Sequence, residues 1–140
     1  MMGLFFEDLT VGQSAEMTRT VTVEVIEAFA EVSGDANPLH LDHEFARTTV
    51  FGERIAHGML AAAYVSAVLG MQLPGPGAVY VTQSLRFRRP VKIGDEVTAR
   101  VTVRELDDRH GRATLRTVCE VGGKVVMDGE AVVMPPRKAA

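Results

Sequence analysis

The sequence predicts an α+β domain in which a curved antiparallel sheet wraps around one long hydrophobic helix. No Asp, Glu, Lys or Arg lies between Arg54 and Arg86, and residues 55–73 are mostly apolar, which is typical of a helix buried on nearly all sides. From Ala78 onward apolar and polar residues alternate with a period of two, which predicts β-strands. A length of 140 residues, 46% hydrophobic and 24% charged, is that of an ordinary globular chain. We therefore expect residues 1–140 to form a single domain.

The first half of the chain begins with a strand over about 14–21, where Thr and Val recur. Thr22 is an expected N-cap of a helix over 23–33, and Gly34 is an expected end of that helix. Pro38 disfavours a helical conformation at the residue before it, so Asp35 to His40 are expected to form a loop. A short helix over 42–47 follows it.

The second half begins with the apolar helix, from 55–58 to about residue 72, where Pro74 and Pro76 end it. Four strands are expected after it, over about 80–88, 97–103, 114–121 and 124–134. Gly122 and Gly123 form the last hairpin turn. Such an antiparallel sheet has exposed edges, which predicts covering loops or pairing with a second subunit.

Composition excludes several classes of protein. With 15 Lys+Arg against 18 Asp+Glu, the net charge of −3 argues against nucleic acid as a partner. The single cysteine, Cys119, excludes an internal disulfide framework and favours the cytoplasm. The N-terminal segment has no basic region and reaches Glu7 too early for a signal peptide. Residues 55–73 are short and interrupted for a transmembrane helix, so no membrane association is expected.

Asp35 and His40, five residues apart on the predicted loop, are the sharpest candidates for chemistry. A carboxylate near an imidazole can hold a water molecule and move a proton at neutral pH. The alternative is that Asp35 and Asn37 only cap the short helix that follows.

His57 and Gly58 stand at the start of the apolar helix. Backbone N–H groups in a first turn lack partners within the helix and can stabilise an oxyanion, and Gly58 permits close approach of a ligand. Close helix packing explains Gly58 equally well, and His57 taken alone favours a structural role. Ser66, on the same helix, either lines a pocket or bonds a carbonyl four residues back.

Arg86, Arg88, Arg89 and Lys92 form a local basic cluster that could meet phosphates, or be a solvated strand end. His40, His43 and His57 with Asp35 show no zinc-type spacing, so no metal site is expected.

The segment Ser33-Gly34-Asp35-Ala36-Asn37-Pro38-Leu39-His40 resembles the hydratase 2 motif of the MaoC-like family, the (R)-specific enoyl-CoA hydratases with a hot-dog fold. The resemblance continues through residues 51–60, 73–75 and 91–97, and so covers nearly the whole chain. Within the family the chain resembles the short bacterial hydratases that supply 3-hydroxyacyl-CoA for polyhydroxyalkanoate synthesis.

The resemblance implies a homodimer that hydrates enoyl-CoA without a cofactor. It implies that Asp35 and His40 are the catalytic pair and that the Gly58 N–H is the oxyanion donor. It implies that Asn37 holds the loop or orients a catalytic side chain, and that Ser66 lines the acyl pocket or supports the pair. It also favours the basic cluster as a coenzyme A site, so the predicted substrate-binding residues are Asn37, Ser66, Leu69, Arg86 and Arg88. Gly58, Ser66 and Leu69 are expected to share one helical face beside the acyl chain.

Three alternatives remain at this point. The first is dehydration of a (3R)-hydroxyacyl group on acyl carrier protein, the second is hydrolysis of an acyl thioester, and the third is a non-enzymatic acyl-binding module. The intact Asp35 and His40 disfavour the last two.

Overall fold

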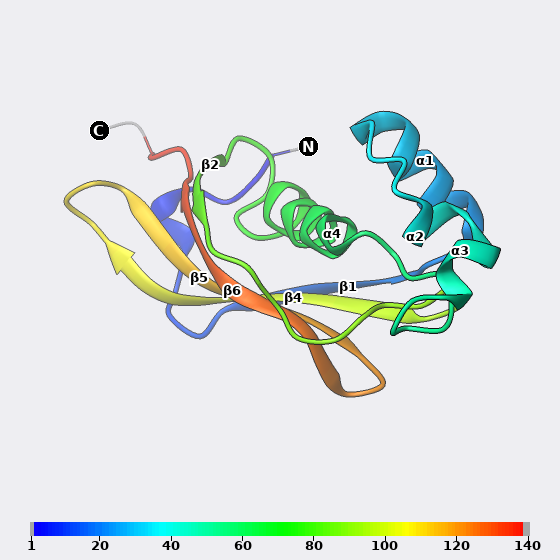
Figure 1. The fold of residues 1–140 in the computed structure, drawn as a ribbon. Helices are drawn as coiled ribbons and strands as arrows, with labels where there is room; N and C mark the ends of the chain where they lie inside the picture. The colour runs from blue at the N-terminus through cyan, green and yellow to red at the C-terminus, as the bar shows by residue number, and fades with distance from the viewer. Residues whose placement is uncertain (1, 139–140) are drawn as a thin grey trace.

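A six-stranded antiparallel sheet curves around one long helix in the computed structural model, which describes residues 2–138 (Figure 1). The strands lie in the order β1-β4-β5-β6-β2, and β3 pairs with β6. Helix α4 lies against the concave face of the sheet, and three shorter helices gather near its N-terminal end (Figure 1). The elements in chain order are η1 (Phe6–Asp8), β1 (Ser14–Thr20), α1 (Val23–Ser33), α2 (Pro38–Leu41), α3 (His43–Arg47), α4 (Gly58–Met71), β2 (Val79–Gln83), β3 (Arg86–Phe87), β4 (Glu96–Asp107), β5 (Arg112–Val121) and β6 (Lys124–Met134).

The predicted fold class and most of the predicted elements are confirmed. Thr22 caps α1, because its side chain accepts a hydrogen bond from the Val25 N–H at 3.2 Å. Gly34 ends the helix with a φ of 81°, a left-handed conformation that glycine adopts at little cost. Cys119 faces inward and is fully buried, and this burial raises the pKa of its thiol to about 12.

The single strand expected over 80–88 is wrong, because the chain forms two strands, β2 and β3, with a break between them. The break coincides with a close crossing of backbones. A Cβ atom added to Gly129 on β6 would lie only 1.9 Å from the Ser84 carbonyl oxygen. The Gln83 side chain also donates to this carbonyl, at 2.8 Å. The register of β2 against β6 shifts as well, between Tyr80 and Thr82, so regular pairing does not continue into β3.

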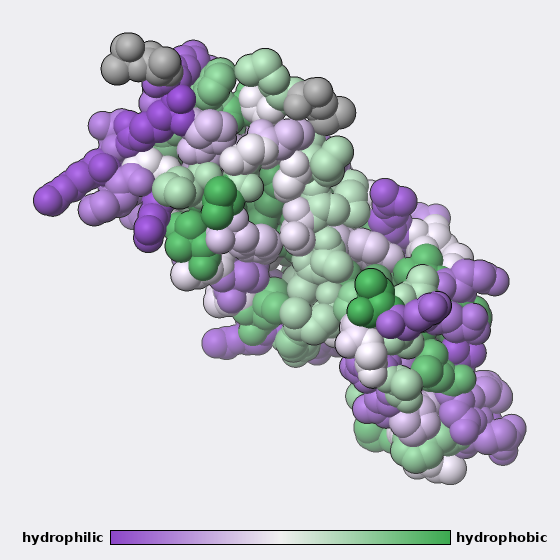
Figure 2. Space-filling view, turned by 90° about the horizontal axis from the view of Figure 1, so that it is seen from above, coloured by the Kyte–Doolittle hydropathy of each residue, from purple (hydrophilic) through white to green (hydrophobic). Residues whose placement is uncertain are grey.

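Helix α4 is covered on one face and open on the other, which corrects the expectation of a helix buried on nearly all sides. Its covered face packs on the sheet through Leu60, Ala61, Ala62, Val65, Val68 and Leu69. On the open face, Met59 is 54% exposed, and Ala63 and Ser66 are exposed as well. Figure 2 shows apolar surface across the middle of the face that carries α4, with hydrophilic side chains at both ends. The sheet of this chain covers only one side of the helix.

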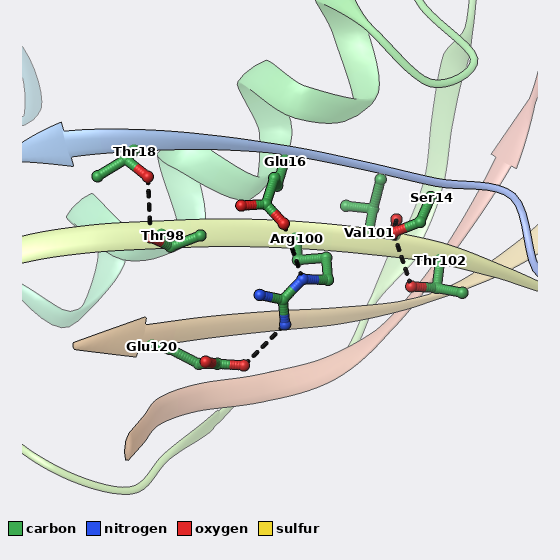
Figure 3. A network of polar contacts seen from close by, with 8 residues as sticks. All are labelled: Ser14, Glu16, Thr18, Thr98, Arg100, Val101, Thr102 and Glu120. Atoms are coloured by element: carbon green, nitrogen blue, oxygen red, sulfur yellow. Dashed lines mark hydrogen bonds and ion pairs between the residues drawn. The ribbon is translucent and has the colours of Figure 1, made fainter. Parts of the chain in front are cut away.

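The opposite, convex face of the sheet is polar. Val97, Ala99, Val101 and Val103 of β4 are buried toward α4, so the residues between them point away from it. Among these, Arg100 bonds Glu16 of β1 at 3.1 Å and Glu120 of β5 at 2.8 Å (Figure 3). Hydroxyl pairs flank this ion pair network on both sides, Thr18 with Thr98 and Ser14 with Thr102 (Figure 3). This side of the sheet is therefore built to face water.

No helix among residues 2–138 is long and apolar enough to cross a membrane.

Candidate active site

The segment after α1 is ordered by two successive hydrogen bonds from backbone N–H groups to side chains. The Asp35 carboxylate accepts from the Asn37 N–H at 3.2 Å, and the Asn37 side chain accepts from the Leu39 N–H at 3.0 Å. Asn37 is thus the N-cap of α2, with Pro38 at its first position, where a missing N–H costs nothing. The prediction of a loop from Asp35 to His40 is therefore wrong at its C-terminal end, because Pro38 begins a helical turn that carries His40.

His40 is 8% exposed, and its ring is held in one orientation. Its Nδ1 lies 2.7 Å from the Ile55 carbonyl oxygen, which can only accept, so Nδ1 carries the proton and Nε2 has a free lone pair. The Arg54 side chain donates from Nε to the His40 carbonyl at 2.8 Å. Burial lowers the pKa of His40, and nearby His57 lowers it further, whereas the Ile55 carbonyl and Asp35 act in the opposite direction. The lowered pKa favours the neutral form of His40 at pH 7, in which Nε2 can accept a proton.

This lowered pKa predicts the pH dependence of the activity. Because the pKa of His40 lies below its ordinary value of 6.5, the neutral imidazole persists to lower pH than in a solvent-exposed histidine. We expect kcat/KM to stay constant from about pH 8 down to the ordinary value for histidine and to fall only below it. A kcat/KM profile whose acid limb has its midpoint above 6.5 would contradict this assignment.

The structure brings Asp35, His40 and His57 together, with one side-chain ligand atom of each within 4.8 Å of the others. Asp35 is exposed and both histidines are buried. One carboxylate and two imidazoles are also a set that metals bind. The two imidazole rings are also close to each other, with centroids 3.9 Å apart and an interplanar angle of 31°. A carboxylate beside an imidazole can also move a proton at neutral pH.

Gly58 is the first residue of α4, so its N–H has no partner within the helix. A Cβ atom at this position would lie 2.8 Å from Cε1 of Phe87, so the absence of a side chain lets the Phe87 ring approach. Both residues line a hollow of about 270 Å³, to which His57 contributes but Asp35 and His40 do not. The other lining residues are Phe51, Ile55, Ala56, His57, Ala61, Arg88, Arg89, Pro90, Val91, Val126 and Met127.

The three arginines of the predicted basic cluster are divided between two places. Arg88 and Arg89 line the hollow that contains Gly58, whereas Arg86 lies with Arg116 in a separate polar depression that Arg88 also borders. Arg88 forms an ion pair with Asp128 at 3.3 Å, and Arg89 donates to the Val125 carbonyl at 2.9 Å. Of the two arginines predicted to bind substrate, Arg88 therefore lines the same hollow as Gly58, whereas Arg86 does not.

Gly58, Ser66 and Leu69 do not share a pocket, contrary to the expectation from their spacing. Ser66 is exposed and lines an apolar groove of about 500 Å³ between α4 and β2, together with Phe29, Met59, Ala62, Ala63, Tyr80, Val81, Thr82, Gln83 and Leu85. Leu69 is 2% exposed and belongs to the hydrophobic core. Two helical side chains three residues apart point in directions that differ by about 60°. At the boundary of the covered face, this difference places Ser66 in the groove and Leu69 in the core.

Residues that no local pattern in the sequence singled out also shape the site. The Ile55 main chain orients His40, and Phe87 closes over Gly58. Residues 54–57 are themselves held by β-type bonds to residues 91–92, including the Ala56 N–H to the Val91 carbonyl at 2.7 Å. These contacts join parts of the chain that are distant in sequence.

Three comparisons with known proteins bear on this site. The family model described as "MaoC like domain" matches residues 8–127. The chain is 54% identical over 134 residues to a Rhodospirillum rubrum protein named (R)-specific enoyl-CoA hydratase, covering 96% of this chain and 93% of that protein. It is 42% identical to an Arabidopsis thaliana protein named 3-hydroxyacyl-[acyl-carrier-protein] dehydratase, mitochondrial, over 91% of this chain and 78% of that protein.

The fold is also similar to that of a solved structure, described as the (R)-hydratase from A. caviae involved in PHA biosynthesis. The TM-score is 0.90 at 48% sequence identity, and the match covers 93% of this chain and 99% of that chain.

Proposed function

The chain belongs to the family of MaoC-like domains, and from this membership and the geometry around His40 we propose that it hydrates trans-2-enoyl-CoA to (3R)-3-hydroxyacyl-CoA. The enzyme is then a hydro-lyase with the hot-dog fold of the hydratases it resembles. One observation carries the proposal: an exposed carboxylate and a buried neutral imidazole lie together at the open N-terminus of a helix. The (R) configuration of the product follows the names of the relatives.

The proposed reaction begins with a water molecule between Asp35 and His40. His40 Nε2 takes a proton from this water as its oxygen bonds to C3 of the enoyl group, and the electrons of the C2–C3 double bond move onto the thioester oxygen. The imidazolium formed on His40 then returns the proton to C2, which restores the thioester carbonyl. The Asp35 carboxylate stabilises the imidazolium during its short lifetime. The sum is the addition of one water, with no change of redox state, so the chemistry requires no redox cofactor.

The Gly58 N–H is the proposed donor to the thioester oxygen, where negative charge develops. A preformed donor of this kind is worth about 3–4 kcal/mol in comparable sites. The hollow beside Gly58 gives a thioester access to this donor, and Arg88 and Arg89 at its wall can meet the phosphates of a carrier. Asn37 contributes indirectly, because it caps the turn that carries His40.

The direct test is hydration of crotonyl-CoA and of a medium-chain trans-2-enoyl-CoA, followed by the loss of ultraviolet absorbance of the conjugated thioester. Chiral analysis of the product is expected to give the (3R) alcohol. Thiol release, measured in parallel, would instead indicate a thioesterase. Unchanged absorbance with either substrate, and with the reverse dehydration, would refute the proposal.

A second candidate differs only in the carrier. The identity to the Arabidopsis dehydratase named for acyl-carrier-protein substrates supports a (3R)-hydroxyacyl-acyl-carrier-protein as the substrate. The same enoyl group on CoA and on acyl carrier protein distinguishes the two candidates, and we expect the higher kcat/KM on CoA.

Ser66 is proposed to line the path of the acyl chain, along the apolar groove between α4 and β2. If so, replacing Ser66 by Phe narrows the groove and lowers the ratio of kcat/KM for C8 over C4 enoyl-CoA, because a short chain does not reach the obstruction. Ala67, one position along and half-buried, is the matched control for a Phe substitution on this helix. An unchanged C8/C4 ratio in Ser66→Phe would place the chain elsewhere. Leu69→Ala, in contrast, is expected to cost about 2–5 kcal/mol of stability by leaving a cavity in the core.

The protein is proposed to be a homodimer that joins through β2 and the open face of α4. β2 is an edge strand, and its side chains are exposed on both faces, Val79 by 53%. An uncovered apolar edge beside an apolar groove is typical of an interface, and a second copy would cover both.

Light scattering at micromolar concentration is expected to give twice the 15.2 kDa protomer mass. Val79→Lys places a charge on the proposed edge and should shift the protein toward the monomer. Val32→Lys changes an exposed valine of α1 in the same way and should leave the mass unchanged. A monomeric wild-type protein would contradict the proposal.

A cytoplasmic location is proposed from the lone buried thiol of Cys119, which forms no disulfide. Because the A. caviae structure is described as involved in PHA biosynthesis, we propose the same use for the (3R) product here.

A further inference from the structure

His57 contacts both members of the proposed catalytic pair, although the sequence favoured a structural role for it. The residue is 3% exposed and stands at the N-cap of α4. Its Nε2 lies 2.9 Å from the Asp35 main-chain oxygen. Because a carbonyl oxygen only accepts, Nε2 carries the proton and Nδ1 does not. His57 therefore holds the backbone of Asp35 from a point 22 residues further along the chain.

The same ring supports His40. The centroids of the His40 and His57 rings are 3.9 Å apart. Phe29 also packs against His57, with ring centroids 4.9 Å apart. His40 is thus fixed by two contacts of different kinds: its Nδ1–H donates to Ile55, and its face rests on His57. Without the second contact, the ring keeps one hydrogen bond about which it can tilt.

His57 has a feature that costs stability. Its Nδ1 is buried and has no hydrogen-bond partner. No other buried side-chain nitrogen or oxygen of residues 2–138 lacks a partner. Such unsatisfied groups are rare in folded proteins and call for an explanation in each case. A phenylalanine or leucine at this position would fill the space without that cost, but it could not donate to Asp35.

The polar surroundings of this ring come from three elements. Asp35 lies before α2, His40 lies on α2, and Arg54 donates to the His40 carbonyl from the segment before α4. The proximity of the His57 ring is one of the causes, after burial, that lower the pKa of His40.

We infer that His57 is a positioning residue that fixes the distance and orientation between Asp35 and His40 and transfers no proton in the reaction. This inference rests on the proposed hydratase activity. Misplacement of a reacting group by about 1 Å can cost on the order of 100-fold in rate, so a residue that supports both groups affects kcat strongly without touching the substrate.

Three substitutions separate the two contacts. His57→Phe keeps a ring against His40 but cannot donate to Asp35. His57→Gln keeps an N–H donor near the position of Nε2 but loses the ring. His57→Ala loses both. We expect kcat to fall by about 100-fold in His57→Ala, to recover in part in each of the other two variants, and KM to change by no more than about threefold.

Two further measurements distinguish positioning from a general loss of structure. In an Asp35→Asn background, His57→Ala should add little further loss, because residues that act as a unit are not additive. In His57→Phe and His57→Gln the acid limb of the kcat/KM profile should move to higher pH, because the neighbouring imidazole that disfavours the charged His40 is gone. His110→Ala, on an exposed turn and paired with Asp107, is the matched control and should have wild-type kcat.

The outcomes separate this inference from the proposed function. An inactive wild-type protein refutes the hydratase proposal itself. An active wild type with unchanged kcat in all three variants overturns only the role of His57, as does a full additional loss in the Asp35→Asn background. Circular dichroism checks folding. If none of the three variants folds, His57 is a structural residue and the inference is wrong.

Discussion

Replacing Asp35 by Asn, or His40 by Ala, is expected to lower kcat/KM for enoyl-CoA hydration by at least about 100-fold, the lower range of what general acid–base groups supply. Asn has nearly the shape of Asp and can still accept from the Asn37 N–H, so the turn is retained while the charge is lost. His40→Ala removes the Nε2 lone pair that is proposed to take the proton from water. We therefore expect both losses in kcat rather than in KM.

Two matched variants test the specificity of these losses. Asp108→Asn makes the same chemical change on an exposed turn, and His110→Ala does so for the histidine. Both are expected to hydrate enoyl-CoA at the wild-type rate. Circular dichroism spectra and Tm values near wild type would show that Asp35→Asn retains the fold. Near-normal turnover of a folded Asp35→Asn or His40→Ala protein would refute the proposed roles.

The second large effect is expected at Gly58, where two substitutions differ by one N–H group. Gly58→Ala keeps the N–H and adds a Cβ that crowds the Phe87 ring, so the ring must shift. Gly58→Pro crowds the same ring and also removes the N–H. Proline suits the first position of a helix, and His57 already has the extended backbone that precedes a proline, with φ −60° and ψ 136°.

We expect Gly58→Pro to have a kcat at least about 100-fold below that of Gly58→Ala, the loss seen when one oxyanion donor is removed. Because both variants disturb Phe87, their ratio isolates the donor. Repeating the pair in a Phe87→Ala background removes the crowding, and the ratio should persist there. Equal rates for the two variants would show that the thioester oxygen does not meet this N–H.

The sequence predicts well where local signals act within a few residues. The bounds of α1 follow from Thr22 and Gly34, and the last hairpin follows from Gly122 and Gly123. Each of these depends on the conformational preference of one residue or on a hydrogen bond to a near neighbour. The same kind of signal explains the missed turn, since Pro38 starts a helix as readily as it ends one.

The site depends on contacts that local signals do not contain. His40 is oriented by a carbonyl 15 residues away, and His57 by one 22 residues away. The break between β2 and β3 coincides with a close approach to Gly129, which lies more than forty residues further along the chain. The sequence singled out Asp35 and His40 as candidates, but the tautomer of His40 and the mutual orientation of the two side chains are set by the assembled fold.

The two edges of the sheet differ in a way that limits how many copies can associate. At the β1 edge, Glu16 is paired with Arg100 and hydroxyl groups line the strand, so an incoming chain would meet charged and polar side chains. At the β2 edge, an incoming chain would meet exposed valines instead. In the proposed dimer, two copies pair through the same β2 edge of each, and a third copy would meet only the charged β1 edge. Such a dimer would be closed and would not grow into open-ended fibres, as a sheet with two adhesive edges could.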